Sequence, residues 1–417
     1  MKPLWRRLFT FDDLMVTLGV CVAVATLFFL PQNLSFLSPV AQALGDLDLT
    51  DMVFTEFRDD SHTFFDSNIV IVNIGRLSRE EVAQELHNIS KYHPKAIGID
   101  AFFRMPKDPT GDSLLADAFR QVGSVVLVSK VSYKTEEAKD AERATQEFDT
   151  LELSHPMFDS VTKHGFANLV VDQQAAFMTC REVSFSETYQ GGREESFPIV
   201  MAGLVNETAK QNALRRQNAT EVVNYRGNLS SFYTVDVDLA MDSTADLSFL
   251  KNKIVLMGYL GPSFSEPSLE DALFTPLNPQ YVGRSYPDMY GIVVHANVLS
   301  MILRGDYINK MSLPTGMVIG LLLLMVNVMI FSFVFTHIEN WYDTIALILQ
   351  LGQSVLIFYL LVTVFAAYNY KLYLTPSLFG VALVGTVHDL YRDSIKKIVL
   401  SAREKFSRRF TTKKRTT

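Results

Sequence analysis

The stretch that decides the fold is IVIVNIGRLSREEVAQELHNISKYHPKAIGIDAFF, residues 69–103. It begins with the β-branched run IVIVNIG, which is typical of a strand buried on both faces. Ser78 and Glu81 then have the spacing of a capping box, so a helix is predicted to begin there and to end before Pro94. A second apolar run, Lys95–Phe103, completes a strand–helix–strand unit. This order predicts parallel strands joined by a helix that covers the sheet.

The same alternation continues along the chain. Asp112 is predicted to open a second helix, and the apolar run Ser124–Val131 is predicted to be a third strand. Because these strands are apolar throughout, helices should cover both faces of the sheet. We therefore predict an α/β domain with a mostly parallel sheet. Further strands are expected at Glu221–Tyr225 and Lys253–Gly258, followed by a helix at Gly291–Leu303.

Apolar segments also divide the chain into membrane and non-membrane parts. Residues 14–31 carry no charge, and residues 313–335 and 344–367 are long enough to cross a hydrocarbon core that needs about 20 apolar residues. A fourth apolar segment, residues 372–391, is shorter and contains Thr375-Pro376 near its start. Counting it, we predict four transmembrane helices, one N-terminal and three C-terminal.

The charges next to these segments predict their orientation. Lys2, Arg6 and Arg7 precede the first segment, and residues 392–417 contain ten Lys and Arg against two acidic residues. Basic flanks stay in the cytoplasm, so residues 1–13 and the basic tail 392–417 are predicted to be cytoplasmic. Both ends then lie on one side, which requires an even number of spans. Residues 32–312 are accordingly predicted to be extracytoplasmic, with the first span as an uncleaved signal anchor.

Composition limits the partners and cofactors. The chain has a net charge of −7, and its acidic residues are concentrated in residues 32–312, which argues against a nucleic-acid partner. Two cysteines exclude a disulfide framework, and the histidines lack metal-ligand spacing, so neither a metal nor a cofactor is predicted. The tail is predicted to contact the lipid bilayer or an acidic protein partner through basic residues that include Arg392, Lys396, Lys397, Arg403, Arg408 and Arg409.

Candidate ligand-binding residues follow from the predicted sheet. Ligands of open parallel sheets bind outside the carboxyl ends of the strands, which favours Asp100, Gly258, Asp271 and Thr275. An aspartate that merely caps a loop or helix is the alternative for the two carboxylates. On the helix at 291–303, His295 and Asn297 are tentative candidates, but they are two residues apart and do not share a face. A core histidine bonded to a backbone carbonyl is favoured over a metal ligand.

The order of these motifs resembles the CHASE type-2 domain, an extracytoplasmic sensory domain of bacterial membrane receptors. The similarity extends over roughly residues 45–391 and includes the arrangement of one span before the domain and three after it. It rests on the ordered set PKAIGIDAFF (94–103), Asp112 with Leu115-Ala116, GFAN (165–168) with Asp172, Phe249 with KIVLMG (253–258), Asp271 with Thr275-Pro276, and Gly291 with HAN (295–297).

The resemblance implies a sensor in the bacterial cytoplasmic (inner) membrane that works as a homodimer. Two positions depart from the family's pattern: Gly75 stands where an aspartate is usual, and residues 173–176 read QQAA where glycine and arginine are usual. The family's receptors continue into a cytoplasmic effector domain, but this tail has no glycine-rich phosphate loop and no kinase signature. Output is therefore expected from a separate protein.

Three functional hypotheses follow. The first is a non-enzymatic sensor whose outer domain binds a ligand or an envelope protein and relays the change through its membrane helices to a separate partner. The second is a structural or assembly subunit of an envelope complex. The third and least favoured is an enzyme, because the sequence has no GxSxG nucleophile elbow, although a dispersed catalytic triad would leave no local signature.

Overall fold

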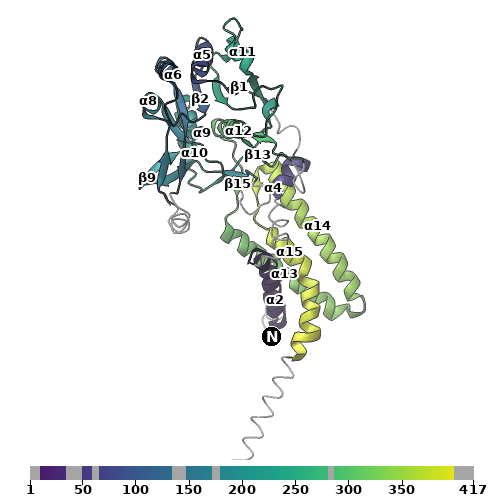
Figure 1. The fold of residues 1–417 in the computed structure, drawn as a ribbon. Helices are drawn as coiled ribbons and strands as arrows, with labels where there is room; N and C mark the ends of the chain where they lie inside the picture. Colours follow the sequence, from purple (N-terminus) through teal and green to yellow (C-terminus); the bar gives the residue numbers. More distant parts are fainter. Residues whose placement is uncertain are drawn as a thin grey trace, which may run out of the picture. The chain divides into compact units, whose positions relative to one another are not determined.

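The computed structural model describes residues 10–33, 49–58, 65–133, 147–170, 179–279 and 286–398. The chain forms two units, an α/β unit (residues 43–308) and a helical unit (residues 1–42 and 309–417). Figure 1 labels the elements of both units. Each unit is described by itself below.

The deciding stretch folds as predicted from residue 66 to residue 100. Strand β1 spans Asp66–Asn73, helix α5 spans Arg79–Ser90 and strand β2 spans Ala96–Asp100. The capping box is confirmed, since the Ser78 side chain accepts from the Glu81 backbone N–H and the Glu81 side chain accepts from the Ser78 backbone N–H. Both bonds satisfy N–H groups that a helix start otherwise leaves unpaired.

The predicted start of the second helix at Asp112 is wrong. Helix α6 spans Pro109–Val122, and its N-cap is Asp108, whose side chain accepts from the Gly111 backbone N–H. Asp112 is instead a buried residue that pairs with Arg79 of α5. Asp112 therefore serves as an ion-pair partner, and Asp108, directly before Pro109, caps the helix.

The main sheet is mixed, which corrects the prediction of a mostly parallel sheet. Seven strands contribute, with β12 between β1 and β2 and with both β5 and β6 next to β3. The edge strand β5 runs antiparallel to β3, because it returns directly along β3 after the charged segment that follows that strand. The other pairings are parallel. The remaining strands of this sheet are β3 (Val125–Ser132), β5 (Thr150–Glu152), β6 (Lys163–Phe166), β11 (Phe232–Val235) and β12 (Ile254–Gly258).

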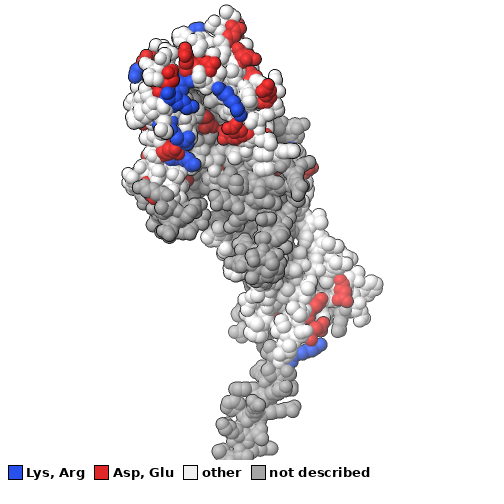
Figure 2. Space-filling view, viewed as in Figure 1, with Lys and Arg blue, Asp and Glu red and all other residues white. Residues whose placement is uncertain are grey.

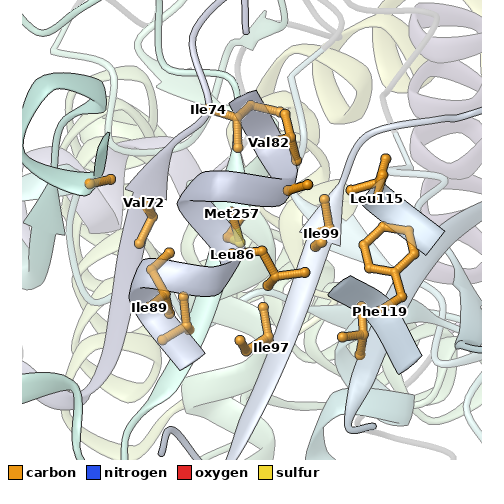
Figure 3. Packing of buried hydrophobic residues seen from close by; sticks show 14 of the residues in the cluster. Val72, Ile74, Val82, Leu86, Ile89, Ile97, Ile99, Leu115, Phe119 and Met257 are labelled. Carbon is orange, nitrogen blue, oxygen red and sulfur yellow. The ribbon is translucent and has the colours of Figure 1, made fainter. Parts of the chain in front are cut away.

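Helices pack on both faces of this sheet (Figure 1). One face is covered by α5, α6 and the short helix α11 (Val237–Met241), and the other by α9 (Phe197–Val205) and α12 (Gly291–Arg304). Figure 3 shows the first of these layers, in which Leu86 and Phe119 pack over Ile97 and Ile99. Burial of alternate residues on opposite faces explains why each central strand is a continuous apolar run.

Smaller elements surround the sheet. The strand predicted at Glu221–Tyr225 is reduced to β10 (Glu221–Val222), which pairs with β7 (Glu182–Val183) outside the main sheet. A buried ion pair, with Arg181 Nη2 2.6 Å from Asp51 Oδ2, anchors α4 (Leu49–Met52) to this region. The others are β4 (Glu147–Phe148), β8 (Ser186–Tyr189), β9 (Gly192–Glu195), β13 (Ala272–Leu273), β14 (Met289–Tyr290), α8 (Pro156–Asp159) and α10 (Glu207–Leu214).

Among the described residues of the helical unit, three helices are long and apolar enough to cross a membrane: α2 (Phe11–Asn33), α13 (Leu313–His337) and α14 (Tyr342–Tyr368). The predicted fourth span forms α15 (Thr375–Leu390), a 16-residue helix that continues into a π-helical turn, Tyr391–Ile395. Four spanning helices are therefore not confirmed, because α15 is shorter than a bilayer crossing requires. Two short strands, β15 (Asn309–Lys310) and β16 (Tyr370–Lys371), pair in this unit.

Polar side chains and glycines mediate the contacts between these helices. Asn327 of α13 donates from Nδ2 to Oε1 of Gln353 of α14, at 2.9 Å. Gln350 of α14 donates to the Ala382 carbonyl of α15. A Cβ atom added at Gly316 would lie 2.7 Å from the Tyr373 carbonyl oxygen, so the absence of a side chain there permits the close approach.

Candidate functional site

Three central strands end in one row at the carboxyl edge of the sheet. In the parallel register, Asn73 of β1 is paired with Gly258 of β12, and Gly258 is paired with Asp100 of β2. Register partners in a sheet point to the same face. The predicted Asp100 and Gly258 are therefore neighbours, and Asn73 completes the row.

Helix α12 begins directly over this row. A Cβ atom added at Gly258 would lie 2.8 Å from the Cβ of Ile292, so only glycine lets the first turn of α12 approach the strand end. At Gly291 an added Cβ would lie 3.5 Å from Asp271 Oδ2 and 3.8 Å from Asp100 Oδ2. The structure thus brings the predicted carboxylates Asp100 and Asp271 together at the N-terminus of α12.

Burial and mutual repulsion make this pair easy to protonate. Burial, with the nearby Asp271 charge, raises the pKa of Asp100 to about 7. Burial, with the neighbouring Glu270, also raises the pKa of Asp271. The positive end of the α12 dipole partly offsets these effects, since anions are stabilised at helix N-termini.

Within the described residues, the side chains of Asp100 and Asp271 have no partner in the protein. Among the described residues, no side-chain hydrogen bond or ion pair is found for Asp100 or Asp271, although the Asp271 carbonyl accepts from the Gly291 N–H at 3.1 Å. Asp271 also adopts a left-handed backbone with φ of 60°, which is uncommon for a non-glycine residue. Two such carboxylates can share a proton or accept hydrogen bonds from a donor-rich or cationic ligand. We call Asp100, Asp271 and the first turn of α12 the carboxylate edge.

Asn73 organises the loops around the carboxylate edge, and sequence reasoning missed it. Its side chain is fully buried and donates to Asp236 Oδ1 and to the Gly261 carbonyl, while its Oδ1 accepts from the N–H groups of Gly75 and Leu260. The sequence feature that could have pointed to this role is an asparagine at the last position of an otherwise apolar run.

Thr275 has a structural role in the loop after Asp271. Its hydroxyl donates to Asp288 Oδ2 at 2.5 Å, and its backbone N–H donates to Asp288 Oδ1 at 2.8 Å. Thr275 is almost completely buried. These two bonds fix the loop at Asp288.

His295 and Asn297 point into different surroundings on α12. Asn297 accepts from the Arg226 N–H at 2.7 Å and donates to the Gly227 carbonyl at 3.0 Å, so it fastens that loop to the helix. His295 packs edge-on against Phe197 of α9, and burial lowers its pKa to about 4. The buried Nδ1 of His295 has no hydrogen-bond partner among the described residues, so the predicted bond to a backbone carbonyl is not found at this atom. Among these residues, no group of three or more His, Cys, Asp or Glu is placed to hold a metal ion.

A separate polar hollow of about 400 Å³ lies between β6, α9 and α10. It is lined by His164, whose Nδ1 lies 3.1 Å from Asp159 Oδ1, and by the ion pair of Lys210 with Glu195 at 2.7 Å. In the sequence, His164 directly precedes the GFAN segment (165–168), which is part of the resemblance to the CHASE type-2 domain. On the face in Figure 2, basic and acidic side chains are interspersed over the part of the α/β unit that the structure describes.

The basic residues predicted to contact lipid or a partner are partly engaged within the helical unit. Lys396 pairs with Asp12 of α2, and the Arg392 guanidinium lies 3.8 Å from the centre of the Phe335 ring. Lys397 is exposed and lies 3.6 Å from Asp393. The predicted contacts at Arg403, Arg408 and Arg409 lie outside the described residues.

Comparison with known proteins agrees with this architecture. The model of the CHASE2 domain, a sensory domain family, matches residues 20–334, which begin within α2 and end within α13. The match thus starts earlier and ends sooner than the resemblance seen in the sequence, and it does not include α14 or α15. Searches of curated proteins and of solved structures find no match. Because the family model covers most of the chain, this protein belongs to the CHASE2 domain family.

Proposed function

We propose that this protein is a non-enzymatic sensor of the bacterial inner membrane that binds its ligand at the carboxylate edge. The observation that carries the proposal is the position of α12. This helix begins against two carboxylates that have no side-chain partner among the residues the structure describes. It ends at Arg304, with only residues 305–312 between it and α13. Membership of a sensory domain family supports the same conclusion.

The chemistry of the edge favours a ligand that carries positive charge or several hydrogen-bond donors. Such a ligand would stabilise the ionised form of Asp100, whose pKa lies near 7 when the edge is free. Ligand binding would then lower the pKa of the pair, and by linkage binding would weaken as the pH falls below 7. An anionic ligand, or a neutral ligand without hydrogen-bond donors, would gain nothing from these groups when they are ionised.

The proposed relay uses the rigidity of α12. Its residues from Gly291 to Ile302 are buried, so a shift of its first turn would be carried along the helix rather than absorbed locally. Output would come from a separate protein, and a homodimer would be the working form. The α/β unit is proposed to be extracytoplasmic, with both chain ends in the cytoplasm.

The ligand proposal is tested by a thermal-shift screen of the full chain in mild detergent. The panel contains small amines, amino acids, polyamines and divalent cations. A stabilising compound should lose its effect on Asp100→Asn/Asp271→Asn but keep it on Asp242→Asn/Asp246→Asn, a control with the same change of charge at exposed positions. Stabilisation that survives loss of both edge carboxylates would overturn the assignment of the site.

Orientation is tested separately by cysteine labelling in cells. Thr150→Cys and Ser230→Cys, in a chain without its two native cysteines, should react with a membrane-impermeant maleimide added from the periplasmic side. Protection of both positions until the membrane is permeabilised would overturn the proposed topology.

A second candidate function, an assembly subunit of an envelope complex, is favoured by exposed apolar side chains near the edge. Phe264, Leu269 and Tyr286 belong to the loop segment that precedes α12, and Tyr286 is 76% exposed. Exposed apolar residues that lie close together often mark protein contacts. Cross-linking in native membranes distinguishes the two functions, since a stoichiometric partner lost on Leu269→Ser/Tyr286→Ser would favour assembly.

A further inference from the structure

The polar hollow between β6, α9 and α10 has charges of both signs on its walls. Its volume of about 400 Å³ is within the range of about 300–1,000 Å³ that is usual for small-molecule sites. Lys163 of β6 lines one wall and Glu207 of α10 lines another, while α9 contributes Val200, Gly203 and Leu204. None of these residues belongs to the carboxylate edge, so the hollow is a separate place in the α/β unit.

Two glycines shape the hollow and place its charged side chains. A Cβ atom added at Gly203 would lie 2.7 Å from Lys210 Cδ and 3.3 Å from Glu207 Oε2, so both side chains lie against α9 at this point. A Cβ atom added at Gly165 of β6 would lie 2.8 Å from a backbone atom of α9. Since alternate residues of a strand point to the same face, Lys163 projects from β6 toward the α9 side as well.

Four charged or ionisable side chains of the lining are paired within the protein. His164 Nδ1 lies 3.1 Å from Asp159 Oδ1, and Lys210 Nζ lies 2.7 Å from Glu195 Oε2. The first pair joins β6 to α8, and the second joins α10 to β9. The role of these four side chains is therefore to hold the walls of the hollow in place.

Lys163 and Glu207 are left for a ligand. Among the residues that the structure describes, the Lys163 side chain has no hydrogen bond or ion pair. Glu207 Oε1 accepts from Gln211 Nε2 at 2.6 Å, and Oε2, the atom beside Gly203, has no partner within the same described residues. A cation and an anion thus line one hollow without pairing with each other.

This arrangement favours a molecule that carries both charges. A simple anion would be attracted by Lys163 but repelled by Glu207, and a simple cation would meet the reverse. A ligand with a carboxylate and an ammonium group would form a charge-assisted hydrogen bond with each side chain. A large apolar ligand would remove both charges from water without giving them a partner.

We propose that the polar hollow binds a small zwitterion, an α-amino acid or a short peptide, with its carboxylate on Lys163 and its ammonium group on Glu207. Such a ligand would contact α9 and α10, which both pack against α12, the proposed relay helix. The hollow is therefore a second ligand site of the sensor. It does not depend on binding at the carboxylate edge.

Calorimetric titration of the full chain in mild detergent tests the proposal. The panel contains free amino acids in one arm and dipeptides in the other, so the two sources of the same chemistry are separated. For the compound that binds most tightly, N-acetylation removes the positive charge and amidation of the carboxylate removes the negative charge. Each change should weaken binding roughly tenfold, since each removes one hydrogen bond between charged groups. Absence of binding across the panel, or equal binding of the blocked forms, would overturn the proposal.

A pair of substitutions assigns the site. Lys163→Gln/Glu207→Gln keeps the net charge and should weaken binding roughly 100-fold, because both contacts are lost. Lys251→Gln/Glu266→Gln makes the same change at exposed positions that do not line the hollow and should leave the affinity unchanged. Circular dichroism checks that each variant is folded.

The carboxylate edge provides the last comparison. Asp100→Asn/Asp271→Asn should keep the affinity for the zwitterion, since these residues do not line the hollow. Binding that is lost in this variant but kept in Lys163→Gln/Glu207→Gln would place the compound at the carboxylate edge. That result would overturn the second site and support the first.

Discussion

Glu85 of α5 offers the most direct test of how burial controls the stability of the α/β unit. Its side chain is completely buried, and neither carboxylate oxygen has a hydrogen-bond partner among the described residues. One turn further along α5, Asn88 donates to the Ala240 and Met241 carbonyls, so this side of the helix faces α11. Burial raises the pKa of Glu85 from 4.5 to about 8. The folded protein therefore holds Glu85 protonated at neutral pH.

The sign of the effect on stability follows from linkage. Unfolded Glu85 ionises above pH 4.5 and folded Glu85 only above about pH 8, so folding requires proton uptake between these values. The resulting destabilisation is about 1 kcal/mol at pH 5 and about 3 kcal/mol at pH 7, and it is constant above the folded pKa. Acidification toward pH 5 should therefore stabilise the wild-type protein relative to a variant without this carboxyl group.

The perturbation is Glu85→Gln, which keeps the shape of the side chain and removes its titration. Urea unfolding of the full chain in detergent, followed by near-ultraviolet circular dichroism at pH 5, 6, 7 and 8, measures both proteins. The stability of Glu85→Gln relative to wild type should rise by about 2 kcal/mol between pH 5 and pH 7. Any fixed effect of the buried amide is the same at every pH and does not alter this difference.

Glu80→Gln, an exposed position on the same helix, is the matched control and should show no such trend. Parallel pH profiles for Glu85→Gln and wild type would refute the reasoning. That result would mean that Glu85 is ionised in the folded protein and has a partner or solvent that this structure does not provide.

Three further substitutions test other parts of the fold by thermal unfolding. Gly258→Ala places a methyl carbon 2.8 Å from the Ile292 Cβ and should destabilise the protein by about 1–3 kcal/mol, and a neutral result would contradict the close packing of α12. Asp112→Ala leaves a buried arginine without its carboxylate and should lower the melting temperature several times more than Asp117→Ala, which breaks an exposed pair. Ser78→Ala removes the Oγ that accepts from the Glu81 N–H and should lower stability by about 1 kcal/mol, and unchanged stability would contradict a contribution of this capping bond.

Features encoded by neighbouring residues were predicted well. The capping box joins residues three apart, and the apolar runs of β1, β2, β3 and β12 are visible without knowledge of their partners. The three long membrane helices were predicted for the same reason, since a span requires only a continuous apolar run. The fourth predicted span was not confirmed, because α15 has only 16 residues.

Features that depend on partners distant in the chain were not predictable. The role of Asp112 depends on Arg79 of another helix, and its position near a helix start suggested a cap instead. The insertion of β12 between β1 and β2, and the antiparallel return of β5 along β3, leave no trace in local periodicity. Each strand would look the same in the sequence whichever neighbour it had.

The carboxylate edge combines features that depend on neighbouring residues with features that depend on residues distant in the chain. The amino-acid order alone places Asp100 and Gly258 near the carboxyl ends of two predicted strands. Only the folded chain brings Asp271 against Asp100, since that approach requires β12 beside β2 and α12 packed over Gly258. The shared site is therefore a property of long-range packing, because the repulsion and burial that raise the pKa values arise only when distant segments exclude water together.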